Sequence, residues 1–289
     1  MRHKNWWIAL FLAPTVFLFL LIYVLPLGAV FVTSLFDYRL TTAHAAFVGL
    51  DNYRSLLHTP SFRQALWNTL LWVLLQSTVH VGLGVLLAVI LFRRPKGWRF
   101  LRTAYMVPSI ISNAALGLIF LHLFNPKFGL VNGILNKLGL GALARNWLVD
   151  SDTAFPAVTL IWIFFAGYTT TLVLAEAESI DPSILEAAKL DGASDRQVDW
   201  FVLLPLLRRT IGVSMILSAA YMLQMFDILY LTTNGGPGRE TTNLALLLYG
   251  IYQSENNYGY ANTVGVCIVL LGLVFMTVIA RALRIHSEE

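Results

Sequence analysis

The chain has 289 residues, of which 57% are hydrophobic and 12% charged, and its mean hydropathy is +0.68 with a formal net charge of +4. A soluble domain averages roughly 45–50% apolar and about 25% charged residues. The charged residues here are therefore too few to cover a water-soluble globule, and the apolar ones are too many for a disordered chain. The single cysteine, Cys267, excludes a disulfide framework. We expect a membrane protein.

Six apolar stretches are long enough, or nearly so, to cross the hydrocarbon core, which takes about 20 helical residues. They predict transmembrane helices at about 7–36, 66–92, 101–124, 154–174, 211–231 and 264–283. The first stretch is too long for a cleaved signal peptide. Pro14 and Pro26 interrupt it, so we expect a kinked or partly broken helix there. The expected fold class is an all-α polytopic membrane protein, a single domain over 1–289.

The positions of Lys and Arg predict sidedness, because cytoplasmic loops carry an excess of both. With the N-terminus inside, 13 of the 20 lie on cytoplasmic segments and 7 on the longer outer ones. Both termini are then expected in the cytoplasm. The short hairpin 93–99, between the second and third stretches, is basic. We interpret it as a positive-inside anchor; contact with a lipid headgroup or a partner is the alternative.

The loop 178–205, between the fourth and fifth stretches, is the one cytoplasmic segment that is more than a hairpin. Asp181 is a good N-cap, and Pro182 suits the first helical position. Gly192 supplies a left-handed residue of the kind that ends helices. This pattern predicts a short helix between Asp181 and Gly192.

A second helix of the same loop is predicted from Ser194 and Gln197, which fit a capping box, and it runs on to Pro205. The first helix has about nine residues and is not stable in water by itself. It therefore rests either on a partner protein, or on the membrane or its own bundle. The physical argument leaves both alternatives open.

A longer pattern in this loop resembles a known family. Its parts are Glu186-Ala187-Ala188, then after three residues Gly192, then after nine residues Val202-x-Leu204-Pro205. This spacing is similar to the EAA signature of ABC importer permeases, so we name residues 178–205 the EAA loop. Val202 stands where the family more often has isoleucine.

Three other motifs resemble the carbohydrate-uptake branch of these permeases, and specifically its first, maltose-permease (MalF-like) subunit. They are Phe47-x-Gly-Leu-x-Asn-Tyr53, Trp67-Asn68-Thr69 and Thr233-x-Gly-Gly-Pro237. The C-terminal tail 284–289 lacks the extension that is typical of the second subunit. The resemblance thus covers nearly the whole chain.

The resemblance implies partners and roles. In such importers a second permease completes the pore, two copies of a cytoplasmic ATPase hydrolyse ATP with Mg, and an extracytoplasmic solute-binding protein delivers the sugar. It implies that Glu186 makes a charged contact with the ATPase and that Ala187 and Ala188 allow a close fit. It also implies that Gly192 sets the angle of the joint and that Pro205 fixes how motion enters the fifth span. The implied location is the bacterial or archaeal cell (inner) membrane.

Catalytic motifs are absent from the sequence. It contains no Gly-x-x-x-x-Gly-Lys-Ser/Thr, no His-Glu-x-x-His, no cysteine pair and no Gly-x-Ser-x-Gly. We therefore expect no ATP or other cofactor bound by this chain and no catalytic residues. The membrane explains the net charge of +4 better than nucleic acid does, so we expect no nucleic acid partner. His80 and His122 are expected to hydrogen-bond within the bundle rather than to bind a metal.

A candidate substrate path lies on the two spans that flank the EAA loop. Its residues are Tyr168, Ser218, Tyr221, Gln224 and Met225. Helical spacing puts Ser218, Tyr221 and Met225 on one stripe and Gln224 on an adjacent one. Aromatic faces and amides suit sugar rings, which offer C–H patches and hydroxyls. The alternative is ordinary helix packing through small and polar residues.

Two rival functions belong to other classes. A stand-alone secondary carrier or channel predicts buried ionisable relays within the spans, which are sparse here, and has no need of the EAA loop. A membrane-embedded enzyme is disfavoured because no nucleophile–base pair or metal-ligand set is found. The expected function is therefore the permease subunit of a sugar importer, not an enzyme.

Overall fold

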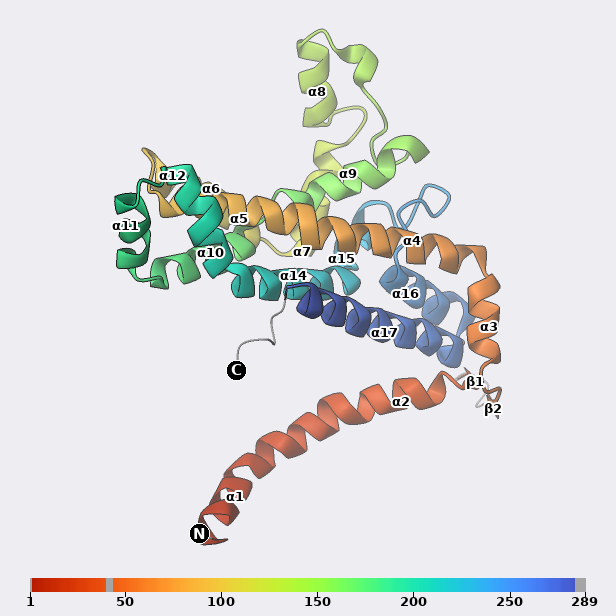
Figure 1. Cartoon of the computed structure of the whole chain (residues 1–289). Coiled ribbons are helices and arrows are strands. Elements are labelled where there is room, and N and C mark those ends of the chain that lie inside the picture. The colour runs from red at the N-terminus through yellow and green to blue at the C-terminus, as the bar shows by residue number, and fades with distance from the viewer. Residues whose placement is uncertain (1, 40–43, 284–289) are drawn as a thin grey trace. The chain divides into compact units, whose positions relative to one another are not determined.

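The computed structural model describes residues 2–39 and 44–283, and most of these are helical (Figure 1). Within them, five helical stretches are long and apolar enough to cross a membrane: Trp6–Thr33, Pro60–Phe92, Ser151–Ser179, Arg208–Thr232 and Tyr258–Ala282. A sixth candidate consists of two helices, Trp98–Ile110 and Asn113–Leu123, bent by 103°. The prediction of six spans is confirmed with the third as a broken one. The tail 284–289 lies outside the described residues.

The chain forms two compact units. The first contains the described residues up to Arg63 together with Leu247–Leu270, and the second contains Gln64–Leu246 and the described residues from Leu271 onward. The unit boundaries fall within the helices α4 (Pro60–Leu75), α16 (Leu244–Glu255) and α17 (Tyr258–Ala282).

The first span is one continuous helix. It comprises α1 (Arg2–Phe19), a π-helical turn η1 (Leu20–Val24) and α2 (Leu25–Thr33). Pro14 lies inside α1 without a break. The expected interruption takes the form of the wider π turn just before Pro26, whose ring has no N–H for the preceding turn.

In the first unit, a few hydrogen bonds hold the end of the first span against the helix that follows the hairpin. The elements that follow α2 are the antiparallel hairpin of β1 (Phe36–Arg39) and β2 (His44–Phe47), and then α3 (Asp51–His58). The Asn52 amide donates to the carbonyls of Ser34 at 2.9 Å and Phe36 at 3.0 Å, and the hydroxyls of Tyr53 and Ser34 lie 2.7 Å apart. Asn52 and Tyr53, from the motif Phe47-x-Gly-Leu-x-Asn-Tyr53, thus anchor the chain where it leaves the first span.

The second unit holds nearly all of the second span, the third to fifth spans and the last part of the sixth. Its elements up to the EAA loop are α4, η2 (Gln76–His80), α5 (Val81–Phe92), α6 (Trp98–Ile110), α7 (Asn113–Leu123), α8 (Leu130–Lys137), η3 (Gly141–Leu143), α9 (Ser151–Ile163) and α10 (Gly167–Ser179). Those from the EAA loop on are α11 (Pro182–Leu190), α12 (Asp195–Val198), η4 (Asp199–Leu203), α13 (Leu204–Leu206), α14 (Arg208–Leu223), α15 (Asp227–Thr232), and parts of α16 and α17.

The helices α5 and α10 pack closely along each other. They approach most tightly at Gly84, where a Cβ atom would lie 2.7 Å from the Thr169 side chain. An apolar cluster joins them to the end of the EAA loop; its buried members are Ala88, Leu91, Val173, Leu174, Ala177, Leu203 and Leu207. This cluster is the base on which the loop helices rest.

Candidate functional site

The first helix of the EAA loop, α11, has both of its predicted ends. The Asp181 carboxylate accepts from the Ser183 N–H at 2.9 Å, which caps the N-terminus. At the C-terminus Gly192 has φ +88°. Its N–H reaches the Lys189 carbonyl, and the next N–H, of Ala193, reaches the Ala188 carbonyl. This is the Schellman arrangement, which satisfies carbonyls that the helix itself leaves unpaired.

The second helix of the loop also begins as predicted. The side-chain oxygen of Gln197 accepts from the N–H and the hydroxyl of Ser194, each at 2.8 Å. Between α12 and α13 the chain widens into the π turn η4, which stands just before Pro205. Pro205 lies between the fully buried Leu203 and Leu207, so the end of the loop is fastened to the apolar cluster.

The helix α11 is mostly uncovered. None of its residues is buried, and Glu186 and Ala187 are exposed while Ala188 is partly buried. Leu190 is 89% exposed. Leu185 packs partly on the apolar cluster. The helix α11 therefore has one exposed face, which contains Ala187 and the Glu186 carboxylate. Its other face, with Leu185, packs against its own helix bundle.

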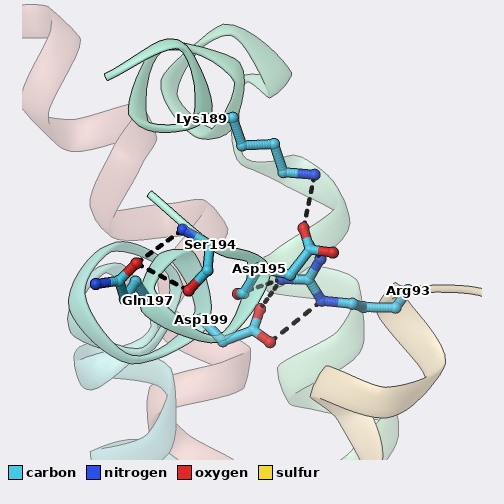
Figure 2. Close-up of polar contacts among 6 residues, drawn as sticks. All are labelled: Arg93, Lys189, Ser194, Asp195, Gln197 and Asp199. Atoms are coloured by element: carbon cyan, nitrogen blue, oxygen red, sulfur yellow. Dashed lines mark hydrogen bonds and ion pairs between the residues drawn. The ribbon is translucent and has the colours of Figure 1, made fainter. Parts of the chain in front are cut away.

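An ion-pair cluster at the joint of the two loop helices was not predicted (Figure 2). Arg93, which directly follows α5, donates from Nε and Nη2 to the two carboxylate oxygens of Asp199 at 3.1 and 2.6 Å. Its Nη2 also donates to the Asp195 carbonyl at 2.7 Å, and its Nη1 lies 2.8 Å from the Asp195 carboxylate. Lys189 pairs with the same carboxylate at 2.9 Å.

These contacts act on the charges of the cluster. The hydrogen bond from Lys189, together with that from Arg93, lowers the pKa of Asp195. The hydrogen bond to Asp199 raises the pKa of Arg93. Both shifts favour the ionised forms of Asp195 and Arg93. The interpretation of hairpin 93–99 as a plain anchor omitted this role, because Arg93 and Asp199 lie 106 residues apart.

A cavity of about 420 Å³ lies in the second unit between the second, third, fourth and fifth spans. Three of the five predicted path residues line it, namely Tyr168, Ser218 and Tyr221. The volume is in the range of small-molecule sites, roughly 300–1,000 Å³. The Tyr221 hydroxyl donates to the side-chain oxygen of Asn113 at 2.7 Å, which orients the ring at the cavity wall.

The predicted stripe through Met225 is wrong. The helix α14 ends at Leu223, and α15 begins only at Asp227, so helical spacing does not extend across the gap. Met225 is 2% exposed and, like the exposed Gln224, is not among the cavity-lining residues. The amide of Asn243, from a distant loop, donates to the Met225 carbonyl at 2.6 Å and so pairs a group that the helix break frees.

The broken third span supplies a cavity wall that the sequence analysis missed. Between α6 and α7 the chain turns by 103°, and Pro108, Ser109, Ile111 and Asn113 face the cavity from this turn. The Ser112 hydroxyl accepts from the Ala115 N–H and caps α7. Pro108 followed by Ser and Asn inside an apolar stretch was the available signal, because these residues favour helix ends.

Two polar atoms at the cavity have no hydrogen-bond partner among the described residues. They are the side-chain oxygen of Gln76 and the indole nitrogen of Trp162, on residues that are each 4% exposed. His80 lies beside them in the π turn η2, and its Nδ1 is 3.0 Å from the Ile163 carbonyl. Buried polar groups are normally paired, so these two atoms have unused hydrogen-bonding capacity on residues that line the cavity. The described residues hold no group of three or more potential metal ligands.

The motif Trp67-Asn68-Thr69 contacts the loop segment that follows the motif Thr233-x-Gly-Gly-Pro237. The Asn68 amide, 2% exposed at the start of the second span, donates to the carbonyls of Glu240 and Thr242, each at 2.9 Å. The N–H of Leu244 donates to the Thr69 hydroxyl at 3.0 Å. The loop after the fifth span is thereby pinned to the second span.

Replacement of Asn68 by alanine is expected to lower the thermal stability of the purified protein. It leaves the buried Thr242 carbonyl and the partly buried Glu240 carbonyl without their donor. A loss of about 1–3 kcal/mol for each group corresponds to a fall of roughly 5 °C or more in Tm. Thermal unfolding of the detergent-solubilised protein measures it. Gln64→Ala is the control, because it removes only the bond from the partly exposed Gln64 amide to the Asn68 side-chain oxygen and leaves both carbonyls paired. Equal Tm values for both variants would contradict this role of Asn68.

The element order and the cavity define a class: a polytopic helical membrane subunit with a two-helix loop after its fourth span. Residues 80–285 match the model of one protein family, the binding-protein-dependent transport system inner membrane component, and the chain belongs to that family.

Relatives agree with this assignment. The chain is 34% identical to the sulfoquinovosyl glycerol transport system permease protein SmoG of Agrobacterium fabrum, over 95% of this chain and 89% of that one. It is 30% identical to the trehalose/maltose transport system permease protein MalF of Thermococcus litoralis, over 96% and 94% of the two chains. The resemblance to the MalF-like branch is confirmed.

The fold is also similar to that of a solved transporter. A chain in the crystal structure of a bacterial ABC transporter involved in the import of the acidic polysaccharide alginate superposes with a TM-score of 0.85. The identity is 22%, and 99% of this chain and 98% of that chain are covered. Family and relatives together favour an ABC importer permease over a stand-alone carrier or channel, and a transport component over an enzyme.

Proposed function

We propose that this chain and a second permease form the membrane pathway of an importer for a sugar or oligosaccharide, which an extracytoplasmic solute-binding protein delivers. The sugar substrates in the names of the relatives support the substrate class, and the family description supports dependence on a binding protein. The chain acts as a single permease domain over 1–289 in a bacterial or archaeal cell membrane, with both termini in the cytoplasm. The excess of Lys and Arg on the same side supports that orientation.

The observation that carries the proposal is the uncovered helix α11. A nine-residue helix gains little stability by itself in water, yet this one is capped at both ends and buries none of its residues. We propose that its exposed face enters a cleft on one of two cytoplasmic ATPase copies, which hold the ATP and Mg. Glu186 contacts the ATPase, while Ala187 and Ala188 allow close approach.

Motion then passes along the loop. When the ATPases close on ATP they move α11, the Gly192 joint sets its angle to the second helix, and Pro205 leads the movement into α14. Because α14 carries Ser218 and Tyr221, this movement reshapes the cavity. The pathway opens outward to receive the solute, and ATP hydrolysis resets it.

The solute contacts belong to the cavity. Tyr168 and Tyr221, 61% and 43% exposed, offer aromatic faces to the C–H patches of a sugar ring. The hydroxyls of the sugar donate to the unpaired Gln76 oxygen and accept from the unpaired Trp162 N–H. The Ser218 hydroxyl can do either. Gln224 stays a candidate at the exposed edge of the path, whereas Met225 supports it from within the protein.

Purification of the tagged full-length chain from the membranes of its own host tests the proposal. An ATPase and a second permease should be recovered with it, and ATP hydrolysis should rise when the sugar-loaded binding protein is added. Ala187→Trp should lose the ATPase and retain the second permease, since residue 187 is exposed and tryptophan disturbs only the docking face. Ala142→Trp, at another exposed alanine, is the control. A wild-type preparation without any ATPase would overturn the assignment.

A further inference from the structure

The ion-pair cluster of Figure 2 connects the two helices of the EAA loop with the end of α5, where Arg93 lies 106 residues before Asp199 in the sequence. Lys189 belongs to the last turn of α11, Asp195 and Asp199 begin α12 and η4, and Arg93 follows the last residue of α5. The carboxylate of Asp195 bridges the two cations, so the contacts run across the Gly192 joint and on to the end of the second span.

The contacts of Arg93 differ from those of an ordinary surface ion pair, which contributes little. Its guanidinium bonds both oxygens of Asp199, whose side chain is only 18% exposed, and in addition bonds a main-chain carbonyl. Two-pronged contacts of this kind fix geometry as well as energy. Leu91, close to Arg93 in the sequence, and Leu203, close to Asp199, both belong to the buried apolar cluster. Both ends of the contact are therefore anchored in the protein interior.

Both helices that leave this point reach the cavity. The helix α5 runs from Phe92 back to the π turn η2, where Gln76 and His80 line the cavity. The helix α14 runs from Arg208 to Ser218 and Tyr221 on its wall. In the structure η2 also packs against α14. A force applied to the EAA loop therefore has two helical routes to the same cavity, provided that the loop is fixed to α5.

We infer that Arg93 is a positioning residue that fixes the EAA loop to the second span, so that movement of α11 drives both α5 and α14. The inference rests on the proposed function of α11 as the ATPase-docking helix. Without Arg93 the loop retains its covalent link to α14 but loses its polar hold on α5. Docking of the ATPase then survives, while the movement of α11 is passed to α5 only through the apolar cluster and therefore less completely.

The experiment uses the complete complex, purified with its ATPase and second permease and reconstituted in proteoliposomes. The readout is the ratio of ATP hydrolysis with the sugar-loaded solute-binding protein to that without it, together with the amount of ATPase per permease. For Arg93→Asp we expect the ATPase content of the wild type and a ratio lowered at least about fivefold, the lower end of allosteric coupling factors. A merely structural role would instead reduce assembly and lower both hydrolysis rates alike.

Charge reversal of the pair supplies the specific test. Asp199→Arg should impair the ratio as Arg93→Asp does, and the double variant R93D/D199R should recover at least about half of it, because the opposite charges face each other again. Lys96→Asp is the control: it makes the same charge change in the same hairpin, and Lys96 has no ion pair among the described residues.

The inference is overturned if the assembled Arg93→Asp complex keeps the wild-type ratio, or if Lys96→Asp lowers the ratio equally. If Arg93→Asp does not assemble, Asp199→Asn decides in its place, because it keeps the size of the side chain and loses only the charge; a wild-type ratio there overturns the inference. Absence of an ATPase from the wild-type preparation is a different result and contradicts the proposed function itself.

Discussion

Replacement of Gly192 by valine is expected to lower solute transport at least about tenfold while the ATPase stays bound. Gly192 has φ +88°, and a Cβ atom there would meet nothing within 4 Å. The cost of the substitution is therefore one of backbone conformation: a residue with a Cβ loses roughly 1–2 kcal/mol in the left-handed region, and a β-branched one loses more. One or two kcal/mol changes the population of the native joint by about 5–30-fold.

The measurement is sugar uptake into proteoliposomes together with ATP hydrolysis by the same complex. We expect uptake to fall far more than hydrolysis, because the changed angle between α11 and α12 weakens transmission and leaves the docking face intact. Gly192→Asn should be much milder, since asparagine tolerates this conformation at helix ends. Gly133→Val is the matched control, because Gly133 also has open space at its Cβ but no positive φ. Unchanged uptake in Gly192→Val would remove the joint from the mechanism.

Replacement of Tyr221 by alanine should reduce the transport rate at saturating binding protein roughly tenfold or more, with the ATPases still attached. The change removes a ring face and a hydrogen-bonding hydroxyl, each of which contributes about 1 kcal/mol. Tyr221→Phe keeps the ring and loses only the 2.7 Å bond to Asn113, so it should retain more than about a fifth of the rate.

The tyrosine variants separate the cavity from the coupling loop. Binding-protein-dependent ATP hydrolysis reports on coupling, and uptake of labelled sugar reports on the path, so both are measured on each variant. Tyr23→Ala is the control, because Tyr23 is an exposed tyrosine of the first span that is not among the cavity-lining residues. If Tyr221→Ala transports at the wild-type rate, the solute contacts lie elsewhere.

The loop after the fifth span adds a link that the sequence does not reveal. The Asn243 amide holds the Met225 carbonyl in the break between α14 and α15, and Asn68 holds the same loop to the second span. The break was missed because the local sequence, Tyr221 to Asp227, contains no proline or glycine. A polar side chain 18 residues downstream pairs the freed carbonyl, and only a folded chain brings it there.

The sequence alone determined what depends on neighbouring residues. Hydropathy located the six spans, because about 20 apolar residues in succession have few other folds. Asp181, Gly192 and the pair of Ser194 and Gln197 marked the ends of both loop helices, since capping acts within a few residues of the backbone groups that it satisfies. The EAA spacing, read against these helices, led to the family.

Only the tertiary structure decided what depends on contacts between distant segments. It gave Arg93, one of several cations in a basic hairpin, a carboxylate partner 106 residues away. It turned the third span by 103° and so set Asn113 opposite Tyr221. It removed Met225 from the cavity and brought Gln76 and His80 into it. The physical reason is common to these cases: a side chain's partner depends on which helices pack together, and packing is a property of the whole chain that no short sequence pattern contains.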